Sequence, residues 1–170
     1  MTLDSTGWPD GASLLALERS SAKLGSGLCP DDLVGTWRLE RLWSKGRSQP
    51  AHAAAATLRT LAARLALHPA KDGGMQLANT VGLGPLKLCF HGSVAFRGRR
   101  PLLVFQFQTM RVSLAGHLLW TLSLPKPDKR REPFFALISS QRTRTDQRWL
   151  AARGRGGGVA LWVREEDGSA

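Results

Sequence analysis

The chain has no tyrosine and only two cysteines among its 170 residues. Cys29 and Cys89 stand far apart and neither belongs to a CxxC pair, so neither a structural zinc site nor a disulfide framework is indicated. Motifs with a known chemistry are missing too: there is no HExxH, P-loop, GxSxG or dinucleotide fingerprint, and the four histidines are dispersed. We therefore expect no metal site and no catalytic centre, and a reducing compartment.

Long apolar runs are also missing. The first fifteen residues hold two aspartates and no basic residue, which is unlike a secretory signal. No run approaches the roughly 20 apolar residues that a membrane-spanning helix needs. The expectation is a protein that is soluble or attached peripherally, without a transmembrane helix and not secreted.

Acidic residues are scarce, and their scarcity is uneven. The formal net charge is +11, and residues 97–164 carry fourteen Lys and Arg against three Asp and Glu, whereas residues 1–96 carry ten against seven. A basic field of this kind attracts polyanions, either nucleic acid or the anionic surface of a bilayer. A solvated basic surface without any partner has the same composition, so the charge alone does not choose among these.

What is present indicates one globular domain, because 42% of the residues are hydrophobic and the chain is short. Leu14 and Leu17 recur at helical spacing in a segment that Gly25 ends, which predicts a short N-terminal helix. The predicted organisation is an N-terminal helix and linker, one domain and a tail, over residues 1–29, 30–165 and 166–170.

Strand-like alternation dominates the rest of the chain. The first predicted strand lies in residues 31–44, and the Ala- and Leu-rich segment 50–69 is predicted to be a helical insertion. Closely spaced strand patterns separated by Gly and Pro turns favour a mainly β fold, either an up-and-down antiparallel β-barrel or a strongly curved sheet. The later predicted strands are 75–81, 86–98, 101–114, 117–124, 133–141, 147–154 and 158–165.

The strand around residue 105 has one apolar and one amide-bearing face. Leu103, Phe105 and Phe107 share the first, and Gln106 and Gln108 share the second. If the amides point outward they are ordinary surface groups. If they point inward they can hydrogen-bond an oxygen of a ligand in an otherwise apolar cavity.

Several segments resemble a known family. "LVGTWRL" resembles the opening strand of lipocalin-like barrels, and more closely that of the plastid-lipid-associated (fibrillin) domain; "TDQRWLAARGRGGGVALWVRE" resembles that family's closing strands. "LANTV" and "LVFQFQTMRVSL" are similar to strands between them, so the resemblance covers residues 30–165. The chain departs from the family where Trp149 and Leu150 replace a Tyr-Leu pair, and in its Ala-rich segment 44–75. The matched motif positions are Gly35, Trp37, Asp146, Arg153, Gly154 and Gly158.

The resemblance implies a lipocalin-like fold and a function. That function is the non-catalytic binding of a hydrophobic small molecule, a lipid, carotenoid or quinone, at a photosynthetic membrane surface in a cyanobacterium or plastid. The protein would be cytoplasmic or peripheral at the thylakoid, with the Arg and Lys of residues 97–164 facing anionic lipid. No cofactor other than such a ligand is expected. The candidate ligand-contacting residues are Phe90, Phe105, Phe107, Trp120 and Gln106.

Structural roles suit the matched positions. We expect Trp37 to plug one end of the barrel and the Arg153 guanidinium to lie across its indole. Gly35 is predicted to allow a close strand approach, and the glycines of 156–158 to supply the positive φ values of a hairpin turn.

Two other functions fit parts of the sequence. A basic nucleic-acid-binding β domain fits the charge but has no recognisable RNA-binding motif. A bilin lyase of lipocalin-like architecture would need inward polar groups, for which Arg111, His91 and Glu40 are the candidates.

Overall fold

The computed structural model describes residue 3 and residues 7–45, 63–128 and 132–166, and it is mainly β. One α-helix and one 3-10 helix precede nine antiparallel strands. The elements are α1 (Gly11–Leu24), η1 (Pro30–Leu33), β1 (Gly35–Trp43), β2 (Arg64–Pro69), β3 (Met75–Leu83), β4 (Leu86–Arg97), β5 (Leu102–Leu114), β6 (His117–Ser123), β7 (Phe134–Arg142), β8 (Arg148–Gly154) and β9 (Val159–Arg164).

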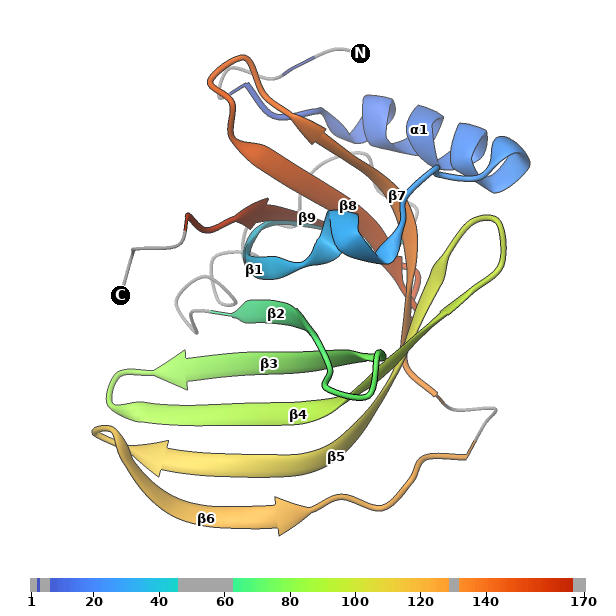
Figure 1. The fold of residues 1–170 in the computed structure, drawn as a ribbon. Coiled ribbons are helices and arrows are strands. Elements are labelled where there is room, and N and C mark those ends of the chain that lie inside the picture. Colours follow the sequence, from blue (N-terminus) through green and yellow to red (C-terminus); the bar gives the residue numbers. More distant parts are fainter. Residues whose placement is uncertain (1–2, 4–6, 46–62, 129–131, 167–170) are drawn as a thin grey trace.

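The strands form one strongly curved sheet that closes on itself. Its order is β4-β3-β2-β1-β9-β8-β7-β5-β6, and an additional β4–β5 pairing completes a ring of eight strands from which β6 extends. Figure 1 shows β3 to β6 fanning out below the more tightly wrapped β7, β8, β9 and β1. The predicted fold class, a lipocalin-like barrel or curved sheet with a helix near the N-terminus, is confirmed.

The long strand β5 pairs with β7 at its beginning and with β6 at its end. Its first residues, 102–104, pair with β7 in a seam of three residue pairs, and residues 109–114 pair with β6 instead. β4 pairs with β5 along its whole length, with a register shift between His91 and Gly92. Because β7 leaves β5 so early, the ring is closed at one end and open at the other.

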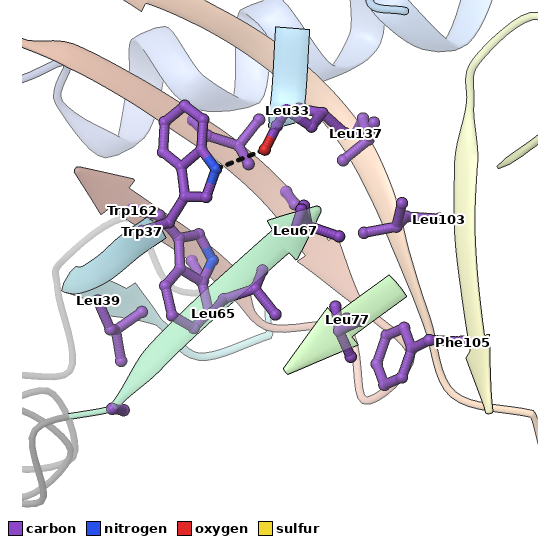
Figure 2. Packing of buried hydrophobic residues seen from close by; sticks show 14 of the residues in the cluster. Leu33, Trp37, Leu39, Leu65, Leu67, Leu77, Leu103, Phe105, Leu137 and Trp162 are labelled. Atoms are coloured by element: carbon purple, nitrogen blue, oxygen red, sulfur yellow. Dashed lines mark hydrogen bonds between the residues drawn. The ribbon is translucent and has the colours of Figure 1, made fainter. Parts of the chain in front are cut away.

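The inner face of the ring carries the larger core. Trp37 lies fully buried in it, and its indole Nε1 donates to the backbone carbonyl of Leu33 at 2.8 Å, so η1 covers this end of the ring (Figure 2). Trp37, Leu39, Leu65 and Leu67 alternate with less buried residues along β1 and β2, the period of strands packed on one side.

Helix α1 covers the outer face of β7, β8 and β9. The Asp10 carboxylate accepts from the Ser13 amide at 2.7 Å and begins the helix, and Gly25, with φ of 91°, ends it as predicted. Leu14 packs in a second buried cluster with residues from these strands and β1, among them Trp43, Ile138, Trp149 and Leu161. The N-terminal segment is therefore packed on the barrel.

One element differs from its prediction. Residues 64–69, assigned by the sequence to a helical insertion, form β2 and pair with both β1 and β3. Leu65 and Leu67 alternate into the core, so the i, i+2 period decides the structure although the composition favours a helix. The remainder of that predicted helix lies outside the described residues.

Candidate ligand-binding face

The inner face of β3, β4 and β5 is apolar except for Asn79. Cross-strand partners share a face, so the register identifies every side chain on it. The side chains and glycine on this face are Met75, Leu77, Asn79, Val81, Leu83, Leu86, Leu88, Phe90, Gly92, Val94, Phe96, Leu103, Phe105, Phe107, Met110, Val112 and Leu114.

Part of this face is not covered by the described residues. Leu77 and Leu103 are fully buried in the core, whereas Leu83 and Leu114 are 58% and 44% exposed, and Trp120 on β6 is 62% exposed. Apolar surface of this extent is unusual unless it binds something. We call the half-buried and exposed stretch the open face; its members are Val81, Leu83, Leu86, Leu88, Phe90, Met110, Val112, Leu114, Trp120 and Leu122.

A chain of aromatic rings joins the open face to the core. Phe90 lies 5.4 Å from Phe107, measured between ring centroids, and Phe107 lies 5.3 Å from Phe105. Phe105 continues to Phe135 at 5.2 Å, and Phe135 to Trp162 at 6.3 Å. The rings are tilted or edge-on, a geometry that aromatic pairs prefer. The candidates Phe90, Phe105 and Phe107 therefore lie in contact along one apolar path.

Gln106 does not belong to this face. Its Nε2 donates to the Glu132 carboxylate at 2.6 Å, on the opposite side of the sheet from Phe105 and Phe107. The Gln108 amide likewise donates to the outward Ser93 hydroxyl. Of the two alternatives for these amides, the outward one is correct, and the inward role considered for Gln106 is wrong.

The predicted contact between Trp37 and Arg153 is also wrong. Trp37 lies in the inner core, whereas Arg153 lies on the outer face, where its guanidinium donates to both Glu18 carboxylate oxygens. Arg100 donates to the same carboxylate at 2.9 Å. Hydrogen bonds from Arg153 and Arg100 hold the pKa of Glu18 below its usual value against the opposing effect of burial. This cluster fastens α1 to the barrel.

The arginine beside Trp37 is Arg164, its cross-strand partner on β9. Gly35 has φ of +131°, and a Cβ there would lie 2.9 Å from the Arg164 Nε. The close approach predicted at Gly35 is therefore that of a guanidinium and not of a strand.

The closing motif forms two turns. Asp146 adopts φ of +63° between β7 and β8, and its carboxylate accepts from Arg142 at 2.8 Å. Gly154 and Gly158 close the β8–β9 hairpin through a 2.9 Å backbone hydrogen bond. Only Gly157 of the run 156–158 has a positive φ, which corrects the expectation for all three.

The outer face of β2 to β5 carries a separate polar hollow of about 680 Å³, lined by His68, His91 and Ser93 among others. Beside it, the Cys89 thiol lies 3.2 Å from the His91 Nε2 and 3.3 Å from the Thr80 hydroxyl. Burial, and then the charge of Arg111, lower the pKa of His91. Glu40, the third group considered for a lyase, pairs with Arg38 on β1, so the three candidates do not converge.

Five of the described arginines of the basic second half pair with carboxylates. Arg97 pairs with Glu132, Arg100 and Arg153 with Glu18, Arg142 with Asp146, and Arg148 with Asp32; these four carboxylates come from four different parts of the chain. Such pairs weaken each guanidinium as a contact for an outside anion. Within the described residues no helix has the length and apolar character needed to cross a membrane.

No protein-family model and no curated protein sequence matches the chain. The open face was visible to sequence reasoning only through its aromatic members. The leucines of the open face were missed as site residues. Asn79, which lies beside the open face on β3, was missed too, although the strict alternation of β3 could have placed it among apolar neighbours.

Proposed function

We propose that the protein is a fibrillin-type, lipocalin-like carrier that binds a hydrophobic small molecule, a lipid, carotenoid or quinone, on its open face. The observation that supports this is an apolar sheet face that is continuous with the core and left uncovered by the described residues. It extends from Phe90 to Leu83 on the β3–β4 hairpin, and across β5 to Trp120 on β6. Ligand sites are mostly apolar, concave and largely pre-formed.

The aromatic chain favours an extended or ring-bearing ligand. Phe90, Phe107 and Phe105 present successive tilted rings along the wall that leads from the open face inward. A flat unsaturated ring or polyene gains contact with each of them in turn. A ligand seated there covers leucines that otherwise face water, at roughly 25 cal/mol for each Å² removed from solvent.

A membrane is the proposed source of the ligand and the partner of the hairpin tips. The β3–β4 and β5–β6 turns lie at the same end of the sheet (Figure 1), where Leu83 pairs with Leu86 and Leu86 with Leu114. Residues 73–127 contain no Asp or Glu, so nothing acidic in this region opposes an anionic bilayer. The resemblance to fibrillins favours a photosynthetic membrane.

A ligand titration tests the carrier function. All-trans-retinol is a suitable probe because its fluorescence reports an apolar environment. We expect saturable 1:1 binding to the wild-type chain, and weakening by at least about tenfold in Leu88→Glu, because the new carboxylate loses its hydration beside the ligand. Ser93→Glu, which adds the same charge to the exposed outer face of the same strand, is the matched control.

Equal binding by both variants, or none by the wild type, would reject the site. Melting temperatures of both variants, measured alongside, separate loss of binding from loss of fold.

Vesicle flotation tests the membrane contact. We expect the wild type to float with anionic phosphatidylglycerol vesicles more than with neutral ones, and less at high salt. Leu86→Glu should float less than the wild type and less than Ser93→Glu, which adds the same charge at a site away from the hairpin tips. Flotation of Leu86→Glu at the level of Ser93→Glu would show that the tips do not make the contact. Salt-sensitive binding of an oligonucleotide with no flotation would favour the nucleic-acid function instead.

A further inference from the structure

The inner face of β3, β4 and β5 holds a single hydrogen-bonding side chain, that of Asn79. Its neighbours along β3 on this face are Leu77 and Val81, and its cross-strand partners are Leu65 and Phe90. An amide in such surroundings is unfavourable unless its donor and acceptor groups find partners.

Within the part of the chain that the structure describes, the Asn79 amide makes no hydrogen bond to another protein group. Its side chain is half-buried and keeps access to the space in front of the sheet. By contrast, the amides of Gln106 and Gln108 on the outer face each have a side-chain partner. Asn79 therefore differs from these two glutamines, because its amide faces an apolar site and has no protein partner among the described residues.

The position of Asn79 matches the geometry of a ligand with one polar end. Leu77 is fully buried in the core and Leu83 is 58% exposed, so Asn79 stands where the packed core gives way to the open face. Leu83 lies four residues further along β3, about 13 Å away. Phe90, directly across from it, begins the chain of aromatic rings.

We propose that Asn79 is a specificity-determining residue of this site and selects ligands that carry a carbonyl or hydroxyl oxygen on an otherwise apolar body. The amide NH₂ donates to a carbonyl or hydroxyl oxygen, and the amide oxygen accepts from a hydroxyl. The apolar remainder of the ligand lies along the open face toward Leu83 and Leu114. A pure hydrocarbon leaves the amide without a partner, which disfavours it. This inference rests on the proposed function of the open face.

Two probes of similar shape test it: decyl-1,4-benzoquinone and decylbenzene, which both carry a decyl chain on a flat six-membered ring, whereas only the quinone ring carries carbonyl oxygens. Their dissociation constants are measured by equilibrium dialysis with wild type, Asn79→Leu and Asn79→Ala. We expect both substitutions to shift the preference for the quinone over the hydrocarbon by about fivefold toward the hydrocarbon, the effect of one hydrogen bond. Val81→Ala is the control, since losing apolar contact weakens both probes and leaves their ratio unchanged.

Infrared difference spectra report the stretching frequency of the quinone carbonyl. A purely structural role of Asn79 would leave this frequency unchanged. A quinone carbonyl that accepts from Asn79 absorbs at lower frequency in wild type and returns to its free position in Asn79→Leu. An unchanged ratio and spectrum in a folded Asn79→Leu that still binds both probes overturn the inference and leave the carrier function standing. Failure of both probes to bind wild type overturns the carrier function and the inference with it.

Discussion

The two halves of the sheet share the same alternation of inward and outward side chains, but they differ in how deeply the inward side chains are buried. In the packed half, β1, β2, β7, β8 and β9, inward residues such as Trp37 and Leu65 are almost wholly buried. In the open half, β3 to β6, inward residues such as Leu83 and Trp120 are more than half exposed. Apolar alternation thus says which side of a strand faces inward, while the strands across the ring decide whether that side is covered.

The outer faces differ as well. The packed half carries α1, held by Leu14 in a buried cluster and by the Glu18 contacts with Arg100 and Arg153. The open half has no carboxylate between residues 73 and 127. The packed half is therefore covered on both faces of its strands, whereas the open half keeps exposed apolar side chains on its inner face.

The largest expected effect is in the packed half. Trp37→Ala removes a fully buried indole and leaves the Leu33 carbonyl without its donor, so the free energy of unfolding should fall by about 3–5 kcal/mol. Urea denaturation measures it. A loss below about 1 kcal/mol would mean that this end of the ring is not the stable part of the molecule.

The next effect is in the pairing of β4 with β5, inside the open half. In Gly92→Ala the new Cβ would lie 2.0 Å from the Gln106 carbonyl, so the β4–β5 pairing must shift, at a cost of about 1–3 kcal/mol or more. We expect faster hydrogen exchange in β4 and β5 than in β9. Gly156→Ala, where a Cβ meets nothing within 4 Å and φ is not positive, is the control and should be close to neutral.

A third effect tests the fastening of α1. Glu18→Gln removes the charge that Arg100 and Arg153 share, and should cost about 1.5–3 kcal/mol at neutral pH. Because folding lowers the pKa of Glu18 below its ordinary value of 4.5, its contribution is complete above that pH and is lost as the pH falls through the folded-state pKa.

Denaturation curves at several pH values between neutral and acidic check this. Wild type and Glu18→Gln should converge in stability as the solution is acidified. A constant difference across the range would contradict the assignment. Asp31→Asn, a substitution of an exposed carboxylate, serves as the control.

The smallest effect on stability is expected in the open half. Trp120→Ala removes an aromatic side chain as large as Trp37, yet it should change the free energy of unfolding by no more than about 0.5 kcal/mol. Retinol affinity, measured in parallel, should fall. If Trp120→Ala destabilised the protein as much as Trp37→Ala, the contrast between the halves would be broken.

The strands and the helix were predictable from local patterns, because Leu14 and Leu17 follow a helical period and Trp37 and Leu39 a strand period. Residues 64–69 were predicted to be helical because Ala and Leu favour helices. Their strand conformation depends on pairing with β1 and β3, which the local sequence does not show. Long-range partners were beyond local reasoning, so Arg153 was matched to Trp37 when its partner is Glu18, a residue 135 positions away. The exposed extent of the open face was equally unpredictable, since it depends on where β7 leaves β5.

The pairing of β1 with β9 has a consequence for how the molecule is made. Trp37 and Trp43 stand opposite Arg164 and Val159, so the first strand of the ring obtains one of its two neighbours only from the last. During synthesis the packed half cannot close until β9 has left the ribosome, and contacts of such long sequence separation form slowly. Until then, the nascent chain exposes the indoles that the finished protein hides best.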